Sequence, residues 1–158
     1  MVSHKIIIMK KICIALDTSP SAQKIAELGY DYAKALGAQV TLVHVVNDPI
    51  YYTMNYDPIM GYDGFLTSDV IELVESHVKE AARFLEASVK HLKNKKIETI
   101  VLDGDTAEAI LKFAATWGAD LIIMGTHSRS GLENLIMGNV AVKVIKQTEI
   151  PVLIIPTK

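Results

Sequence analysis

The sequence predicts an α/β fold: an open sheet of five mainly parallel strands with helices on both faces. Short apolar runs of strand length alternate with longer segments whose apolar residues recur at helical spacing. Strands that alternate with helices pair in parallel through right-handed crossovers. The 158 residues, half of them hydrophobic and 22% charged, suit one packed domain. We expect that domain over residues 9–158, preceded by an extension of residues 1–8.

The composition excludes several classes of partner. A net charge of −2 offers no basic excess for nucleic acid. No apolar run approaches the roughly 18 residues that a membrane span needs. The apolar start of the chain is broken by Lys10 and Lys11, and no signal-peptide cleavage site follows. The single cysteine, Cys13, cannot form an intrachain disulfide, which fits a reducing compartment. We therefore expect a cytoplasmic protein without a membrane or nucleic-acid partner.

The first part of the chain predicts a strand, a helix and a second strand. Lys11–Leu16 is a short apolar run that stops at a polar turn. Within this turn, Ser19 followed by Pro20 is a good N-cap and first-turn pair for a helix that Gly37 ends. Gln39–Val46 is typical of a buried strand. The apolar positions of the helix, which we expect on one face, are Ile25, Leu28, Tyr32, Ala33 and Leu36.

Residues 47–66 predict a loop that is longer than an ordinary connection. They carry prolines, glycines, four tyrosines and two methionines. A long amphipathic helix follows from Ser68 to about Lys93. Its expected apolar positions are Val70, Val74, Val78, Ala81, Leu85, Val89 and Leu92. Its expected solvated positions are Glu72, Glu75, Lys79, Glu80, Arg83 and Glu86.

The rest of the chain repeats the alternation of strand and helix. Turn residues at 103–105 close the third strand, and glycine or proline punctuates the later elements. The expected elements are strands Ile97–Leu102, Asp120–Met124 and Pro151–Ile155, and helices Ala107–Trp117 and Asn139–Gln147.

A ligand site is predicted at the carboxyl ends of the strands. If the chain winds out one way and then back, the strand order is 3-2-1-4-5, and the first and fourth strands are neighbours. Open parallel sheets bind ligands at such a reversal. Asp17 follows the first strand and Gly125 ends the fourth, so these sequence-distant residues converge on one crevice.

Residues 121–141 indicate that the ligand carries phosphate. An apolar strand ends in Met124 and Gly125, and a polar loop follows. Gly138 then precedes the last helix. A glycine-bearing loop that leads into a helix N-terminus presents backbone N–H groups to phosphate.

The chain resembles the universal stress protein family from Met9 to Pro156. The resemblance rests on Asp17 after an apolar strand, VTLVHVV, Gly104, ADLIIMGTH, MGNVA and PVLII, in this order and at the family's spacing. It implies a five-stranded Rossmann-like fold and a homodimer. It also implies ATP binding in one branch of the family, whereas another branch has lost the motif.

The glycine motif of the ATP-binding branch is altered at two positions. Gly125 and Gly138 match it, but Ser128 replaces a glycine and Asn139 replaces a serine or threonine. In a left-handed backbone Ser128 would cost roughly 1–2 kcal/mol, and with a negative φ its hydroxyl could donate instead. Asn139 is a strong N-cap residue whose amide can also donate. We expect a weakened site rather than a lost one.

The resemblance assigns roles to individual residues, each with a structural alternative. Asp17 would lie near the ribose or adenine, or else cap the first helix or the turn before it. Ala15, Val45 and Met124 would line the adenine, although they pack equally well as core. His127 is a hydrogen-bonding loop residue rather than a base, and Arg129 pairs with phosphate or stays solvated. The remaining predicted contacts, mostly with phosphate, are Leu16, Gly125, Thr126, Ser128, Ser130, Gly131, Gly138, Asn139 and Val140.

The sequence indicates neither a metal site nor a catalytic group. No His, Cys or carboxylate pair has metal-ligand spacing, and His44 is typical of a satisfied core histidine. No nucleophile elbow, Walker lysine or carboxylate pair is present.

The leading interpretation is a cytoplasmic, homodimeric, regulatory or stress-response protein that binds ATP with Mg²⁺ on the phosphates. Its dimer would pair the edge strand Pro151–Pro156 of two copies. One alternative is a nucleotide-free module that recruits a protein partner through residues 50–66. A true enzyme of the related Rossmann-type adenine-nucleotide group has less support, because LDTSPSA after the first strand is not a glycine-rich loop. Slow ATP hydrolysis also has less support, because the sequence supplies no dedicated base. Which adenine nucleotide is preferred stays open.

Overall fold

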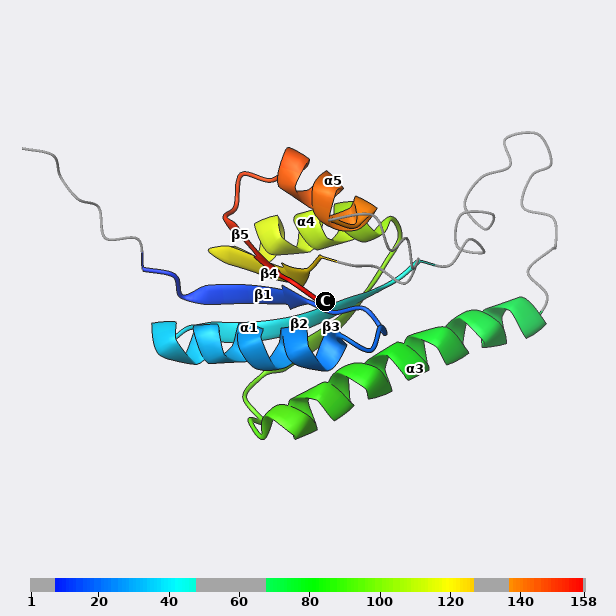
Figure 1. Cartoon of the computed structure of the whole chain (residues 1–158). Coiled ribbons are helices and arrows are strands. Elements are labelled where there is room, and N and C mark those ends of the chain that lie inside the picture. The colour runs from blue at the N-terminus through cyan, green and yellow to red at the C-terminus, as the bar shows by residue number, and fades with distance from the viewer. Residues whose placement is uncertain (1–7, 48–67, 127–136, 158) are drawn as a thin grey trace, which may run out of the picture.

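The sheet has the predicted topology (Figure 1). The computed structural model describes residues 8–47, 68–126 and 137–157. Five strands lie in the order β3-β2-β1-β4-β5, and all four pairings are parallel. The reversal between β1 and β4 is therefore confirmed. The strands are β1 (Lys11–Ala15), β2 (Gln39–Val46), β3 (Glu98–Asp103), β4 (Leu121–Gly125) and β5 (Val152–Ile155).

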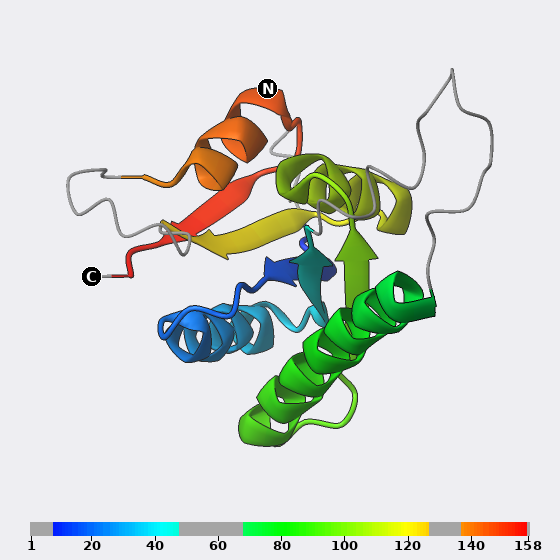
Figure 2. The ribbon, with the colours of Figure 1, turned by 90° about the vertical axis from the view of Figure 1, so that its right-hand side faces the viewer.

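Two helices cover each face of the sheet among the described residues (Figures 1 and 2). One face carries α1 and α3, and its core includes Ile12 and Ile14 of β1. The other carries α4 and α5, and its core includes Cys13 and Ala15 of the same strand. Successive residues of β1 thus serve opposite faces, as strand geometry requires. The helices are α1 (Ala22–Leu36), α3 (Ser68–Leu92), α4 (Thr106–Trp117) and α5 (Asn139–Gln147).

The buried face of α1 differs from the predicted one. Ile25 and Ala33 are buried as expected, but Leu28, Tyr32 and Leu36 are 38%, 51% and 49% exposed. The reason is the close approach of the helix to the sheet, since a Cβ at Gly29 would lie 2.9 Å from Ile14 Cδ1. Small side chains allow this approach, so the helix turns them inward and the large apolar ones outward. The buried residues of α1 are Ala22, Ile25, Ala26, Gly29 and Ala33.

The start of α1 also corrects a prediction. The N-cap is Ser21, without a side-chain cap bond, rather than Ser19. Asp17 Oδ1 accepts from the Ser19 backbone N–H at 3.1 Å and from its hydroxyl at 2.5 Å. The Ser19 carbonyl then accepts from the Ala22 N–H at 3.0 Å. This turn holds Ser19 outside the helix. The predicted end is confirmed at Gly37, which is left-handed with φ 64°.

The remaining elements agree with the predicted ones to within one or two residues, which is the ordinary uncertainty of element ends. On α3, Val74, Ala81 and Leu85 are buried, so the predicted apolar spacing is confirmed there. Residue 47 follows β2, and the rest of the predicted loop lies outside the described residues. None of the helices in the described ranges has the length and apolar character to cross a membrane.

Candidate functional site

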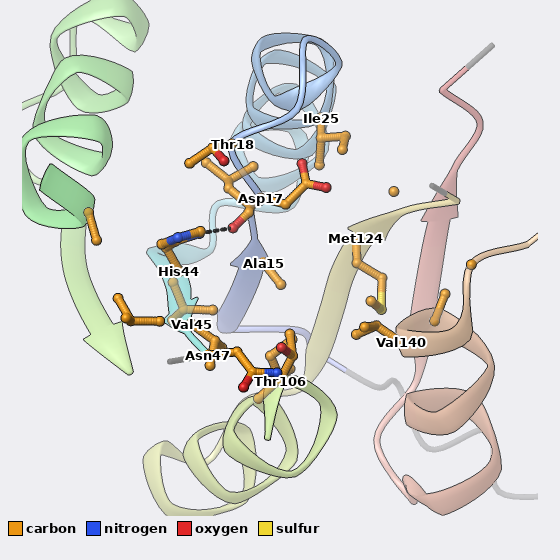
Figure 3. A pocket seen from close by; sticks show the side chains of 18 of the residues that line it. Ala15, Asp17, Thr18, Ile25, His44, Val45, Asn47, Thr106, Met124 and Val140 are labelled. Atoms are coloured by element: carbon orange, nitrogen blue, oxygen red, sulfur yellow. Dashed lines mark hydrogen bonds between the residues drawn. The ribbon is translucent and has the colours of Figure 1, made fainter. Parts of the chain in front are cut away.

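A cavity of about 730 Å³ opens at the carboxyl end of the sheet (Figure 3). It lies where β1 and β4 are neighbours, and the segments after these strands lead to helices on opposite faces of the sheet. All four described helices contribute to its wall. The residues that line it are Ala15, Leu16, Asp17, Thr18, Ile25, Val43, His44, Val45, Val46, Asn47, His77, Glu80, Ala81, Thr106, Ile110, Met124, Gly125, Thr126, Gly138, Val140 and Ala141.

Most predicted site residues that the structure describes share this cavity. They come from β1, β2, β4 and the start of α5, and they are Ala15, Leu16, Asp17, Val45, Met124, Gly125, Thr126, Gly138 and Val140. Asn139 is exposed and does not line the cavity. The predicted contacts His127, Ser128, Arg129, Ser130 and Gly131 lie outside the described residues.

Asp17 lines the cavity two residues after the end of β1. It is half-buried, and both of its hydrogen bonds with Ser19 end on Oδ1. The structural alternative, that it shapes the turn before the first helix, is therefore present. Oδ2 takes no part in either bond, so the same carboxylate can shape the turn and accept from a ligand hydroxyl.

The β4–α5 side of the cavity includes two glycines, Gly125 and Gly138, and the start of a helix. Gly138 is the N-cap of α5 in an extended conformation, which makes Asn139 the first helical residue rather than the cap. The Gly138 N–H donates to the Thr126 carbonyl at 2.5 Å, which brings the start of α5 to the end of β4. The first N–H groups of a helix have no intrahelical acceptor and carry its positive dipole end. This side is suited to an anion.

Packing by itself favours glycine at position 125. A Cβ there would collide with Ile25 Cδ1 and lie 2.9 Å from Thr157 Cγ2. Thr126 and Thr157 reinforce this contact, since their hydroxyls lie 3.0 Å apart and the Thr157 N–H donates to Thr126 Oγ1 at 3.2 Å. The end of β4 is thus held against the C-terminal segment. Gly125 serves packing whether or not phosphate binds beside it.

The opposite side of the cavity is apolar with a polar rim. On this side Ile110 of α4 is buried and Val45 of β2 is half-buried. Figure 3 shows Asn47 and Thr106 beside Val45, whereas Met124 and Val140 lie across the cavity. Apolar walls with a few polar groups are typical of sites for flat organic ligands. Sequence reasoning missed Asn47 and Thr106, whose only signal was their position just after β2 and at the start of a helix.

His44 is the core histidine that the sequence predicted. It is 8% exposed, and its Nδ1 lies 2.7 Å from the Leu16 carbonyl oxygen. Its ring meets Phe84 of α3 edge-on, with centroids 5.5 Å apart. This bond joins β2 to the residue directly after β1, and both residues line the cavity.

Helix α3 closes one side of the cavity, which periodicity alone did not reveal. His77, Glu80 and Ala81 face it from this helix. Glu80 is exposed as predicted for the solvated face, yet it also reaches the cavity edge. The contribution of α3 depends on how far the helix extends past the sheet, and that is a tertiary property.

Ion pairs connect α4 and α5, the two helices that cover the same face of the sheet. Lys143 Nζ of α5 lies 3.0 Å from Asp105 Oδ1 and 3.1 Å from Glu108 Oε1 of α4. Asp105 also caps α4 by accepting from the Glu108 N–H at 3.0 Å. That backbone bond, and then Lys143, hold the pKa of Asp105 below its usual value. Bonds with Asp105 and Glu108 raise the pKa of Lys143. These ion pairs join the middle of α5 to the start of α4.

No group of three or more His, Cys, Asp or Glu side chains able to hold a metal ion occurs in the part of the chain that the structure describes.

Sequence comparison decides the family. The Universal stress protein family profile matches residues 9–156. The chain belongs to the universal stress protein family. One relative, universal stress protein MJ0531 of Methanocaldococcus jannaschii, is 32% identical over 92% of this chain and 81% of its own length. The family assignment and the Rossmann-like fold expected from the resemblance are confirmed.

Solved structures of universal stress proteins share the fold. The structure of MJ0577 of M. jannaschii superposes with a TM-score of 0.75 at 28% identity, covering 96% of this chain and 99% of that one. A universal stress protein in complex with cAMP gives a TM-score of 0.62 at 19% identity, covering 96% and 100% of the two chains. At 19% identity, the similarity to the cAMP complex shows a shared fold and no more.

Proposed function

We propose that this universal stress protein is a cytoplasmic, homodimeric, ATP-binding protein of the stress response, with Mg²⁺ on the phosphates of the nucleotide. The single observation that carries the proposal is the composition of the cavity. The start of α5, where Gly138 is the N-cap, faces an apolar side at β2 and α4, and Asp17 lies in the cavity wall two residues after the end of β1. Phosphate, base and ribose each find a suitable surface there.

The orientation of the nucleotide follows from these surfaces. The phosphates would lie at Gly138 and the first turn of α5, where N–H groups lack helical acceptors. The base would lie between Val45, Ile110 and Met124. Asp17 Oδ2 would accept from a ribose hydroxyl while Oδ1 keeps its turn bonds. The cAMP complex of another universal stress protein supports an adenine nucleotide as the ligand class.

The fit of Mg²⁺ depends on its ligand preference. Mg²⁺ retains several waters and is commonly bound through substrate phosphates. The described residues offer no acidic cluster that would hold it alone. We therefore assign its protein contacts to none of the described side chains. The ion would neutralise phosphate charge, and the output would be binding rather than turnover.

Calorimetric titration of nucleotide-stripped protein with ATP and Mg²⁺ tests the proposal. We expect a dissociation constant in the micromolar range for the wild-type chain. Gly138→Asp should abolish binding, because it places a carboxylate against the phosphates. Gly138→Asn is the matched control, since it adds nearly the same bulk without charge and should bind at least about tenfold more tightly than Gly138→Asp.

Absence of binding at millimolar ATP, by heat and by thermal shift, would overturn the nucleotide proposal. It would favour the nucleotide-free interaction module, whose predicted surface at residues 50–66 lies outside the described residues. Multiple turnovers of ATP at a useful rate would instead favour the enzyme.

The homodimer proposal rests on the sheet edge. Among the described strands, β5 lies at an edge of the sheet beside β4, and its residues Val152, Leu153 and Ile154 are only half-buried. An apolar edge of this kind is a hazard unless covered. Light scattering at several concentrations should give twice the mass of one chain. Val152→Lys should shift the mass toward one chain at low concentration, because lysine on an edge opposes pairing.

A further inference from the structure

Two polar side chains lie near each other at the apolar side of the cavity. Asn47 is the first residue after β2, and Thr106 is the first residue of α4. Their backbones are tied together, because Val46 pairs with Asp103 and its carbonyl accepts from the Gly104 N–H at 3.3 Å. Both side chains line the cavity and lie at the same end of it in Figure 3.

The surroundings of this pair define what it can contact. Val45, Ile110 and Met124 supply apolar walls for a flat ring. The start of α5, where the phosphates are proposed to bind, lies on the other side (Figure 3). A nucleotide with its phosphates there points the edge of its base toward Asn47 and Thr106. These two side chains are therefore placed to distinguish one base from another.

The Asn47 side chain makes no hydrogen bond that would stabilise the described part of the fold. The residue is exposed. Its amide nevertheless offers one acceptor and two donors in a plane. Replacement of Asn47 should leave the fold intact, so changes in ligand preference can be interpreted directly.

The amide matches one purine edge better than the other. Adenine presents the N6 amino donor beside the N7 acceptor, and asparagine pairs with both through its carbonyl and amino groups. Guanine presents two acceptors, O6 and N7, on the same edge, so one of them would face the amide carbonyl. We propose that Asn47, assisted by the Thr106 hydroxyl, selects adenine over guanine by a paired hydrogen bond to N6 and N7. This inference rests on the proposed nucleotide binding.

The test compares three nucleotides on the full-length protein: ATP, GTP and 7-deaza-ATP, which has carbon and hydrogen in place of the N7 acceptor. For the wild-type chain we expect 7-deaza-ATP to bind about fivefold more weakly than ATP, the effect of one lost hydrogen bond. GTP should bind at least about tenfold more weakly than ATP. In Asn47→Ala the affinities for ATP and 7-deaza-ATP should become equal, and the preference for ATP over GTP should fall to near unity.

Asn47→Asp separates base recognition from charge. The added carboxylate weakens every triphosphate by repulsion, but it acts equally on ATP and 7-deaza-ATP, so their ratio reports the N7 contact alone. We expect this ratio to fall to one or invert, because both carboxylate oxygens are acceptors facing N7. Thr106→Val keeps the shape of the side chain without the hydroxyl, and it should reduce the preference for ATP over GTP by less than Asn47→Ala.

The outcomes distinguish failure of the proposed role of Asn47 from failure of the proposed nucleotide binding. A wild-type chain that binds none of the three nucleotides would overturn both. A chain that binds ATP, loses it in Gly138→Asp, and yet keeps the same ATP to 7-deaza-ATP ratio in all Asn47 variants would overturn only the role of Asn47. Thermal unfolding of each variant, expected within a few degrees of wild type, confirms that folded proteins are compared.

Discussion

Aspartates at the two ends of the sheet make different use of their carboxylates. At the amino end, Asp120 precedes β4, and its Oδ2 accepts from the backbone N–H groups of Lys10 and Lys11 at 2.8 and 3.0 Å. Lys11 Nζ in turn donates to the Trp117 carbonyl at 3.1 Å and lies 5.2 Å from the centre of its ring. At the carboxyl end, Asp17 Oδ1 accepts from the backbone N–H and the hydroxyl of Ser19 within its own turn.

The difference follows from the direction in which the chain leaves each strand. β1 and β4 begin side by side, so one carboxylate can join the segments before them. After these strands the chain leads to α1 on one face and to α5 on the other. Backbone groups therefore meet and pair at the amino end, while a cavity forms at the carboxyl end. We therefore expect the stability of the fold to depend mainly on the first end and ligand binding on the second.

Removal of the Asp120 carboxylate should have the largest effect on stability. Asp120→Ala leaves two backbone N–H groups without their charged acceptor, and we expect a loss of about 2 kcal/mol in the free energy of unfolding. Urea denaturation measures it. ATP affinity should not change, because this residue lies at the opposite end of the sheet. Asp120→Asn keeps one acceptor oxygen and should lose less; equal stability of Asp120→Ala and wild type would contradict this account.

Asp17→Ala should show the reverse pattern. We expect ATP affinity to fall about tenfold, because the ribose loses a charged acceptor. The free energy of unfolding should fall by at most about 1 kcal/mol, because the substitution removes only the two part-buried hydrogen bonds of one turn. Calorimetry and urea denaturation measure the two effects. Asp17→Asn keeps an oxygen for the turn and separates them; unchanged affinity in both variants would assign Asp17 to the turn alone.

Asp105 is a third aspartate for this comparison, and its contribution to stability should depend on pH. Asp105→Ala removes the cap of α4 and should cost about 1 kcal/mol at about pH 7. The pKa of Asp105 is lowered in the folded protein, so its stabilisation is present above its usual pKa and is lost as the pH falls through the lowered one. The wild-type and alanine proteins should thus converge in acid.

The control for that experiment is Asp105→Asn, which can still cap the helix but cannot pair with Lys143 as an anion. It should retain most of the stability at neutral pH and show a smaller dependence on pH. A difference between wild type and Asp105→Ala that persists unchanged in acid would show that the carboxylate charge contributes nothing.

Cys13 lies between the two ends and should produce the smallest signal. Burial raises the pKa of its thiol to about 12, so almost no thiolate exists at neutral pH. We expect a disulfide reagent such as Ellman's reagent to react only at the rate of unfolding and to modify the thiol fully in denaturant. Rapid reaction of the folded protein would mean that the middle of β1 opens independently of its ends.

The sequence predicted the sheet because its signals there are local and redundant. The buried strands, the turn residues after them and the helical periodicity agree from Lys11 onward, and the alternation leaves few topologies. The convergence of Asp17 and Gly125 follows from this topology alone, since carboxyl ends of parallel strands share one edge. The cavity therefore contains most described residues of the predicted site.

Predictions that depended on packing distance were wrong. The apolar positions Leu28, Tyr32 and Leu36 of α1 are outside because Gly29 brings the helix close to Ile14. Ser19 does not cap α1 because Asp17 engages it first. In neither case does periodicity or cap preference contain the competing contact.

By itself, the sequence determined the α/β class, the strand order and the family, because patterning, turn chemistry and motif spacing are properties of the chain as it is written. Tertiary structure alone decided which face α1 buries, that His77 and Glu80 reach the cavity from α3, and that Asn47 and Thr106 stand together at its rim. These depend on distances between elements that are remote in sequence. Such distances are set by the volumes of the side chains that separate the elements, and no local pattern encodes them.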